Sequence, residues 1–369
     1  ETAEQAKNNR ENIFVERLVS KVTLTNAATE AWGNSTWTYT VPNAVLGGTV
    51  PGNIDPSYAA GSKITILGWN LDITNNSSYL VRRVEGGWLS DGFKYKGDLN
   101  RFYDVDVLPA VTPSNLFRIN YAVDPNYTSF EEGDFNLVKN IADQENMGKP
   151  VYCYENTFDV ANQKQDRTTR LLIKAQYVPQ GFKDGDSWFT IGASEQPRNG
   201  VDLTNIIKNA LVKKLGNKEI TVNTTNMSGI NNYEENVTIN GNNINADQIE
   251  YLKAEIGDVK AYQKGICYYV VRIKHFGDAE TPWGANTGAP VIDGTTYYKY
   301  ADASVNKEYL GRYGVVRNNW YEVSLNTISG PGTPMIPEPT SEIDDEHSYY
   351  ISARINILSW RLRKQSVDL

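Results

Sequence analysis

Apolar and polar residues alternate with a period of two in several short stretches of the chain. This alternation is typical of β-strands that have one buried and one exposed face. In one such stretch, Leu67, Trp69, Leu71 and Ile73 are predicted to share the buried face. Because the stretches lie far apart in the sequence, we expect mostly non-local strand pairing, as in β-sandwiches with Greek-key connections. The clearest are residues 18–25 (LVSKVTLT), 67–74 (LGWNLDIT), 171–178 (LLIKAQYV), 267–273 (CYYVVRI) and 321–327 (YEVSLNT).

Two segments have helical spacing instead. The spacing of Leu and Ile residues predicts a helix over about 202–216, with Asp202 as the N-cap and Gly216 closing the C-terminal end. A second helix is predicted over about 245–257, where Asn245 and Gln248 have the spacing of a capping box. Long turn-rich insertions separate the predicted strands. We therefore expect a mainly β domain with long loops and two short packing helices.

Composition and charge narrow the function further. The chain has 369 residues and a formal net charge of −8, from 44 acidic and 36 basic residues. An acidic chain of this kind is not expected to bind nucleic acid, which attracts basic surfaces. No apolar stretch reaches the roughly 20 residues that a transmembrane helix needs, and no secretory signal is recognisable. The length allows one large elaborated domain or two unequal ones.

Motifs that would carry catalysis are not found in the sequence. It contains neither a P-loop nor a dinucleotide fingerprint nor a nucleophile elbow. His275 and His347 have no neighbouring ligands at metal spacing. Cys153 and Cys267 stand in apolar runs and are predicted to be buried thiols, with a pair between them left open. We expect no enzyme, no cofactor and no metal site.

Two other functional classes stay open at this level. A glycosidase needs only two carboxylates, which no motif excludes. A glycan-binding surface would use tryptophans in turn-rich segments, although such residues more often fill the space under loops. Spaced aspartates are interpreted as structural turns, because a calcium loop would need more oxygen ligands. The tryptophans are Trp32, Trp37, Trp88 and Trp283, and the aspartate pairs are Asp104 with Asp106 and Asp184 with Asp186.

The end of the chain combines a proline spacer with a strand-like segment. Residues 329–340 (SGPGTPMIPEPT) cannot form a helix or a central strand, and acidic residues follow them. Apolar residues then alternate on one parity and shift to the other at Leu358, which suggests a β-bulge or a hand-over between two sheets. An apolar strand behind a swinging spacer predicts a connector to another molecule, although a plain last strand is the simpler alternative. The candidate donor residues are Ile351, Ala353, Ile355, Ile357, Trp360, Leu362, Val367 and Leu369.

These residues resemble a known family. The segment RNNWYEVSLNTISGPGTPMIPEP (317–339), followed by INILSWRLRKQSVDL (355–369), resembles the C-terminal signature of the type V fimbrillins, which are pilus subunits. KPVYCYENT (149–157) is similar to the family's aromatic strand that ends in Glu-Asn. ERLVSKVTLTN (16–26) and LGWNLDITNNSSYLVR (67–82) resemble the strands at the junction of its two domains. Among fimbrillins, the resemblance is closest to the Mfa-type shaft subunits of minor fimbriae.

The resemblance implies a transthyretin-like β-sandwich subunit that polymerises head-to-tail by donor-strand insertion. It implies a lipoprotein precursor that crosses the periplasm and outer membrane, Arg-specific removal of an N-terminal strand, and a mature form in a surface fimbria. The implied partners are identical subunits, accessory tip or anchor pilins, and host or bacterial receptors. Adhesion, biofilm formation and virulence are the implied roles.

Few residues precede the first family-like strand, so we expect this chain to be largely the C-terminal domain. Residues 1–26 are expected to close an N-terminal domain that is otherwise cleaved off, deleted or undescribed. Residues 27–328 would form the C-terminal sandwich, 329–346 the spacer, and 347–369 the strand region that donates.

Overall fold

The structure is a computed structural model of the 369-residue chain. It describes residues 17–27, 30–32, 37–42, 59–89, 121–275 and 310–342. It also describes the backbone of six short strands outside these ranges: β5 (Lys94–Tyr95), β6 (Leu99–Asn100), β18 (Val291–Ile292), β19 (Thr295–Thr296), β21 (Ile355–Ser359) and β22 (Arg363–Val367).

The first sheet has the strand order β21-β20-β1-β8, and β22 also pairs with β20. Its central strands are β1 (Val19–Asn26) and β20 (Asn319–Leu325), which run parallel to each other. On the other side of β1 lies β8 (Val151–Tyr154), which is antiparallel to it. β1 thus pairs with sandwich strands on both of its edges. Its expected role as the closing strand of an N-terminal domain stays a prediction.

The second sheet has the strand order β17-β9-β3-β2, and all of its pairs are antiparallel. The strands are β2 (Thr38–Thr40), β3 (Lys63–Asp72), β9 (Arg170–Val178) and β17 (Ile266–Arg272). The register between β3 and β9 shifts between Ile66 and Gly68. This irregularity exchanges the parity of the buried face, so Ile66 is buried and Leu67 is only half-buried. The predicted position of Leu67 on the buried face was therefore wrong.

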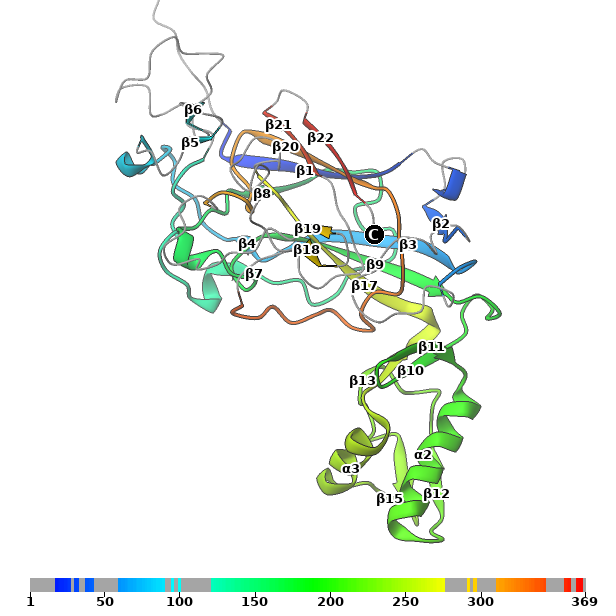
Figure 1. The fold of residues 1–369 in the computed structure, drawn as a ribbon. Coiled ribbons are helices and arrows are strands. Elements are labelled where there is room, and N and C mark those ends of the chain that lie inside the picture. Colours follow the sequence, from blue (N-terminus) through cyan, green and yellow to red (C-terminus); the bar gives the residue numbers. More distant parts are fainter. Residues whose placement is uncertain are drawn as a thin grey trace, which may run out of the picture.

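The two sheets pack face to face and enclose one apolar core (Figure 1). Their inward residues alternate with outward residues along the strands, which is the period of two that the sequence predicts. Most outward residues are polar, but Leu172 and Val270 are apolar and belong to a separate small cluster. The β-sandwich is thus confirmed. The inward residues include Val22, Leu24, Cys153, Tyr321 and Val323 from the first sheet, and Ile64, Trp69, Leu71, Leu171, Ile173, Ala175, Cys267, Tyr269 and Val271 from the second.

A smaller lobe is inserted between β9 and β17 and projects from the sandwich (Figure 1). It has its own apolar core, built around Leu203, Ile207, Leu211 and Leu252 from two helices. One four-stranded sheet contains β10 (Trp188–Ile191), β11 (Ser194–Arg198), β13 (Gly229–Ile230) and β16 (Val259–Tyr262). A three-stranded sheet contains β12 (Ile220–Val222), β14 (Val237–Ile239) and β15 (Asn242–Asn243).

Both predicted helices exist and belong to this lobe. α2 spans Gly200–Leu215 and α3 spans Ala246–Ile256. The capping box of Asn245 and Gln248 is present as predicted. The predicted N-cap of α2 was wrong, because the side chain of Asn199 accepts the hydrogen bond from the backbone N–H of Asp202 at 2.9 Å. Asn199 is an equally good capping residue, and α2 therefore starts earlier than the apolar spacing indicated.

Two stacked aromatic rings connect the lobe to the sandwich. Trp188 and Tyr262 are cross-strand partners, and their ring centroids lie 3.8 Å apart with an interplanar angle of 8°. Both residues are buried in the sandwich core, and the Trp188 indole donates a hydrogen bond to the carbonyl of Tyr177 at 3.0 Å. The base of the lobe is thus part of the sandwich core.

The remaining elements are short. β4 (Thr74–Asn75) pairs with β7 (Phe135–Asn136), β5 with β6, and β18 with β19. Single turns of 3₁₀ helix occur at Glu30–Trp32, Gly86–Leu89, Glu132–Asp134, Val160–Asn162 and Gln263–Gly265. Neither α2 nor α3, the two α-helices of the described part, is long and apolar enough to cross a membrane.

The cysteines are free and buried, as predicted. Cys153 points into the core beside Ser20, whose hydroxyl lies 3.1 Å from the thiol. Burial raises the pKa of Cys153 to about 11 and that of Cys267 to about 12. Both thiols therefore stay protonated and unreactive in the folded chain at neutral pH.

Candidate assembly site

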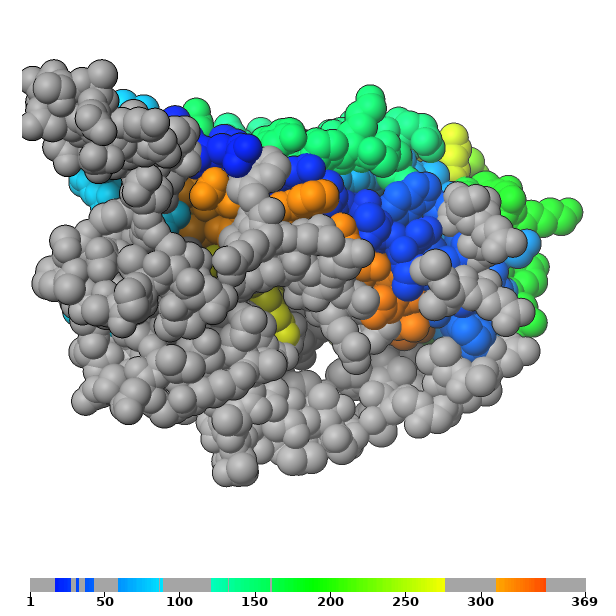
Figure 2. Space-filling view, turned by 90° about the horizontal axis from the view of Figure 1, so that it is seen from above, coloured from blue at the N-terminus to red at the C-terminus, as the bar shows by residue number. Residues whose placement is uncertain are grey.

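The C-terminal strands both pair with β20. On one side of β20 lies β1, and Figure 2 looks onto this region, where blue residues of β1 adjoin orange residues of β20. On the other side, β21 pairs with the first residues of β20 in antiparallel register, with Leu358 opposite Trp320. β22 pairs with the rest of β20 in parallel register, from Arg363 opposite Tyr321 to Val367 opposite Leu325. The C-terminal strands therefore lie at the end of the strand order, beside a central strand.

β21 ends at Ser359 and β22 begins at Arg363, and the two strands run in opposite directions along β20. The shift in alternation between Ile357 and Leu358 lies inside β21, whose side chains are outside the description. The bulge or change of sheet expected at Leu358 therefore stays a prediction.

The candidate donor residues are only partly within the described backbone. Ile355 and Ile357 belong to β21, and Val367 belongs to β22. Their side chains are outside the description, so their role as a donor face stays a prediction. The other five candidates, Ile351, Ala353, Trp360, Leu362 and Leu369, lie outside the described residues.

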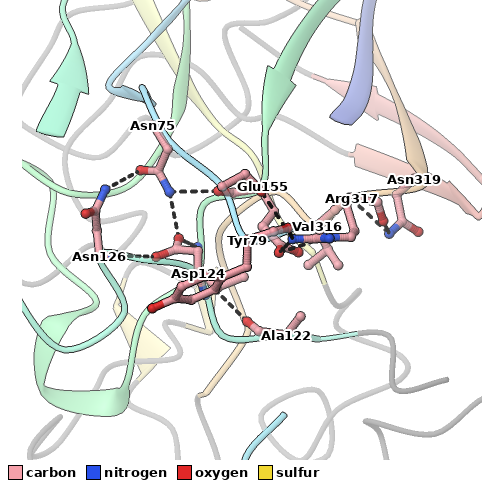
Figure 3. A network of polar contacts seen from close by, with 11 residues as sticks. Asn75, Tyr79, Ala122, Asp124, Asn126, Glu155, Val316, Arg317 and Asn319 are labelled. Carbon is pink, nitrogen blue, oxygen red and sulfur yellow. Dashed lines mark hydrogen bonds and ion pairs between the residues drawn. The ribbon is translucent and has the colours of Figure 1, made fainter. Parts of the chain in front are cut away.

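A buried ion pair connects the end of β8 to the start of β20 (Figure 3). The guanidinium of Arg317 donates to one carboxylate oxygen of Glu155, with its Nε at 2.8 Å, and also to Ser78 and to the carbonyl of Tyr79. The side chains of Arg317 and Glu155 are only 1% and 0% exposed. The second carboxylate oxygen of Glu155 has no hydrogen-bond partner in the described part of the chain. Arg317 thus supplies the hydrogen bonds that compensate this buried charge.

Backbone contacts reinforce the same junction. Asn156 and Val315 exchange two backbone hydrogen bonds of 2.7 and 3.0 Å. The side chain of Asn319 donates to the carbonyls of Val316 and Arg317. Asn318 has a φ of 66°, and its N–H donates to the carbonyl of Val19. These bonds fix the position at which β20 begins.

The fold thus brings together Glu-Asn at 155–156 and Arg-Asn-Asn at 317–319, although Glu155 and Arg317 are 162 residues apart in the sequence. We did not predict that they meet. The available signal was one carboxylate and one guanidinium, each placed at the end of an apolar strand.

A second carboxylate lies in the same polar network (Figure 3). Asp124 accepts hydrogen bonds from the backbone N–H groups of Thr157 and Asn126, both at 2.6 Å, and from the Asn75 amide at 2.8 Å. Burial nevertheless raises the pKa of Asp124 to about 7, with a smaller contribution from the charge of Glu155. The hydrogen bonds from the two N–H groups and from Asn75 oppose this rise.

This pKa shift makes stability depend on pH. Between the ordinary pKa of an aspartate and about 7, the unfolded chain is ionised at Asp124 while the folded chain keeps the proton. The folded chain binds more protons in this window, so stability falls as the pH rises through it and levels off above about 7.

The described part of the proline segment, which we call the strap (residues 329–342), is bound to the sandwich. Thr333 and Tyr268 exchange backbone hydrogen bonds of 2.8 and 2.9 Å. Further along, Arg170 donates to the carbonyl of Pro337 at 2.7 Å.

The strap also contacts the loop before β9. The N–H groups of Gln165 and Asp166 donate to the carbonyls of Glu342 and Thr340 at 2.9 and 3.0 Å. We expected residues 329–346 to form a spacer that can swing. The described part of this segment is instead hydrogen-bonded to the sandwich. The reason is that proline removes donors but leaves carbonyls, and the sandwich supplies the donors.

The tryptophans considered for glycan binding are mostly inside the fold. Trp32 is 0% exposed and Trp88 is 2% exposed. Trp37 packs partly buried against the core, and Trp283 lies outside the described residues. A buried indole cannot stack on a sugar, so the interpretation as core filling holds for Trp32 and Trp88.

The aspartate pairs were interpreted as structural turns. Asp186 accepts a hydrogen bond from the backbone N–H of Lys183, as a structural turn would have it. Asp104 and Asp106 lie outside the described residues. Among the described residues, no three His, Cys, Asp or Glu side chains are grouped to hold a metal ion.

Residues 292–366 match a family described as the C-terminal part of the major fimbrial subunit protein type IV, fimbrillin. The match supports a fimbrillin family. It covers β20, the strap and both C-terminal strands except the last residue of β22. A comparison with the curated proteins gives no match. A fimbrillin family implies a structural role in a cell-surface fimbria, in which the subunit polymerises with other subunits.

Proposed function

We propose that this chain is a fimbrial shaft subunit that polymerises head-to-tail by adding its C-terminal strand region to a neighbouring subunit. The observation that carries the proposal is the place of the fimbrillin match in the fold. The matched residues end in β21 and β22, which lie at the end of the first sheet's strand order. Strands at a sheet edge are the ones that can leave and pair with another chain. A head-to-tail contact of this kind does not close on itself, so it makes a filament.

The proposal extends to the processing and setting of the subunit. It includes a transthyretin-like topology, a lipoprotein precursor that crosses the periplasm and outer membrane, and an Mfa-type shaft role with accessory pilins. It also includes Arg-specific processing. Arg17 is exposed and lies two residues before β1, where a protease could reach it. Adhesion to host or bacterial receptors and biofilm formation are the proposed roles of the fimbria.

The experiment removes the last strand, β22, which pairs with β20 at the end of the first sheet. A chain that ends at Trp360 loses all of β22. A second variant replaces residues 361–369 with Gly and Ser. It keeps the length of the chain and removes only the side chains of the last strand. Both variants are expected to give folded monomers by circular dichroism and gel filtration, with no filaments in electron microscopy. Filaments of normal length from either variant would refute the proposed donor.

A further inference from the structure

The second sheet has a long outer strand whose edge is covered at both ends. β17 is at one end of the order β17-β9-β3-β2, so its outer edge would normally present unpaired backbone groups. At one end of this edge, Tyr268 exchanges two hydrogen bonds with Thr333 of the strap. Just beyond β17, the N–H of His275 donates to Arg312 at 2.9 Å, and Ile273 accepts from Gly314 at 3.0 Å. Segments that are far apart in the sequence thus cover both ends of the edge.

The strap is built to cover an edge and not to extend the sheet. It pairs with β17 only around Thr333, and prolines stand on either side of that residue. A proline has no N–H, so a segment rich in proline cannot serve as the next template strand. The strap therefore terminates the second sheet, because the outer side of the strap offers no regular strand edge for further pairing. Its prolines are Pro331, Pro334, Pro337 and Pro339.

One glycine makes this close approach feasible. A Cβ placed on Gly332 would lie 2.3 Å from the carbonyl oxygen of Tyr268, which is backbone and cannot turn away. The carbonyl of Gly332 accepts a hydrogen bond from the hydroxyl of Tyr262 at 3.1 Å, and that of Gly330 accepts one from Tyr269 at 2.9 Å. Gly332 does not have a positive φ, so the requirement for glycine here is one of space.

Packing holds the next part of the strap. Ile336 packs against Leu172 and Val270, which form a small apolar cluster with Ile141. Arg170 then holds the carbonyl of Pro337. The strap is thus fixed to the strand it covers by hydrogen bonds at the Gly-Pro-Gly segment and by apolar contact further on.

We propose that the strap closes the β17 edge against a strand from a second copy of this chain, and that Gly332 is the residue on which this closure depends. The inference rests on the proposed function, because it concerns which sheet edge accepts a strand during polymerisation. With the β17 edge closed, strand addition is directed to the first sheet. Without the closure, the same donor has a second edge to pair with, and the product is branched or amorphous.

The test uses the full chain with Gly332→Ala, and Gly133→Ala is its control. Gly133 also lacks a positive φ and has no atom within 4 Å of its Cβ position, so the same methyl group is added there without crowding. Hydrogen exchange followed by mass spectrometry reports on the amide of Tyr268, and cross-linking with mass spectrometry maps contacts between chains. In Gly332→Ala, exchange at Tyr268 is expected to be at least about tenfold faster, as for a locally opened segment. New contacts between chains are expected at β17. Gly133→Ala is expected to behave as the unchanged protein.

Two further variants keep the test decisive. Ile336→Ala weakens the strap without crowding, and it replaces Gly332→Ala if that variant does not fold. Adding Tyr268→Lys to Gly332→Ala puts a charge on the open edge and is expected to suppress the β17 contacts while the strap stays undocked.

Two results would overturn the proposal. One is a strap that is released, by exchange at Tyr268, while no contact between chains forms at β17. The other is a strap that stays docked in both Gly332→Ala and Ile336→Ala. If the proposed donor strand is wrong, filaments will form without residues 361–369. That result is independent of the contacts measured at β17, so the two failures can be told apart.

Discussion

Replacing Arg317 by methionine is expected to destabilise the fold severely. Methionine fills a comparable volume but supplies neither charge nor donors. The carboxylate of Glu155 would then stay buried with no hydrogen-bond partner among the described residues, because Arg317 supplies those that it has. Methionine would also leave Ser78 and the carbonyl of Tyr79 without the donor that Arg317 provides.

The magnitude follows from the burial of the pair. Both side chains are at most 1% exposed, so water cannot replace the lost contacts. Removing one partner of a buried ion pair costs about 3–5 kcal/mol, since an uncompensated charge is left inside. Exchanging both partners, as in Glu155→Gln with Arg317→Met, leaves no buried charge and is expected to cost less than Arg317→Met alone.

The assay is urea unfolding followed by fluorescence, with a double-mutant cycle over the two positions. An exposed pair provides the control: Lys253 and Glu250 are 37% and 71% exposed, so Glu250→Gln should change stability by about 1 kcal/mol or less. A loss below about 1 kcal/mol for Arg317→Met would refute the reasoning. So would a cycle in which the two substitutions simply add, because interacting residues show coupling.

Two more predictions follow from the structure. Because burial raises the pKa of Asp124 to about 7, the free energy of unfolding is expected to fall by at most about 4 kcal/mol between pH 4 and pH 8. Asp124→Asn should flatten the part of the profile near pH 6–7 in urea titrations, and an unchanged slope there would contradict the assignment. Replacing residues 190–260 by Asn-Gly joins the cross-strand partners Phe189 and Ala261 by a hairpin turn and removes most of the lobe. The shortened chain is expected to keep a cooperative thermal transition, because the stacked rings and the sandwich core remain. A non-cooperative transition would show that the sandwich needs the lobe.

The sheets were predictable because apolar and polar residues alternate along half-buried strands. The strands at 171–178 and 321–327 were found in this way, whereas both helices were found from the helical spacing of their apolar residues. Leu67 shows the limit, because one irregularity exchanged the faces of β3 and a single sequence carries no mark of it. The N-cap at Asn199 was missed because Asp202, three residues later, is also a residue type that favours the N-cap position.

The assembly region was less accessible to sequence reasoning. The C-terminal strands could be named from their pattern, but their common partner β20 is a non-local contact. The strap looked free because its prolines rule out regular structure. Its docking depends on the donors of Tyr268 and Arg170, which lie far away in the sequence. The pairing of Glu155 with Arg317 was hidden for the same reason.

Electron microscopy of the purified chain after limited Arg-specific proteolysis tests the central claim most directly. The account predicts unbranched filaments from the processed chain that keeps residues 361–369, and none when these residues are removed. A processed chain that keeps residues 361–369 but stays as single particles at high concentration would contradict it.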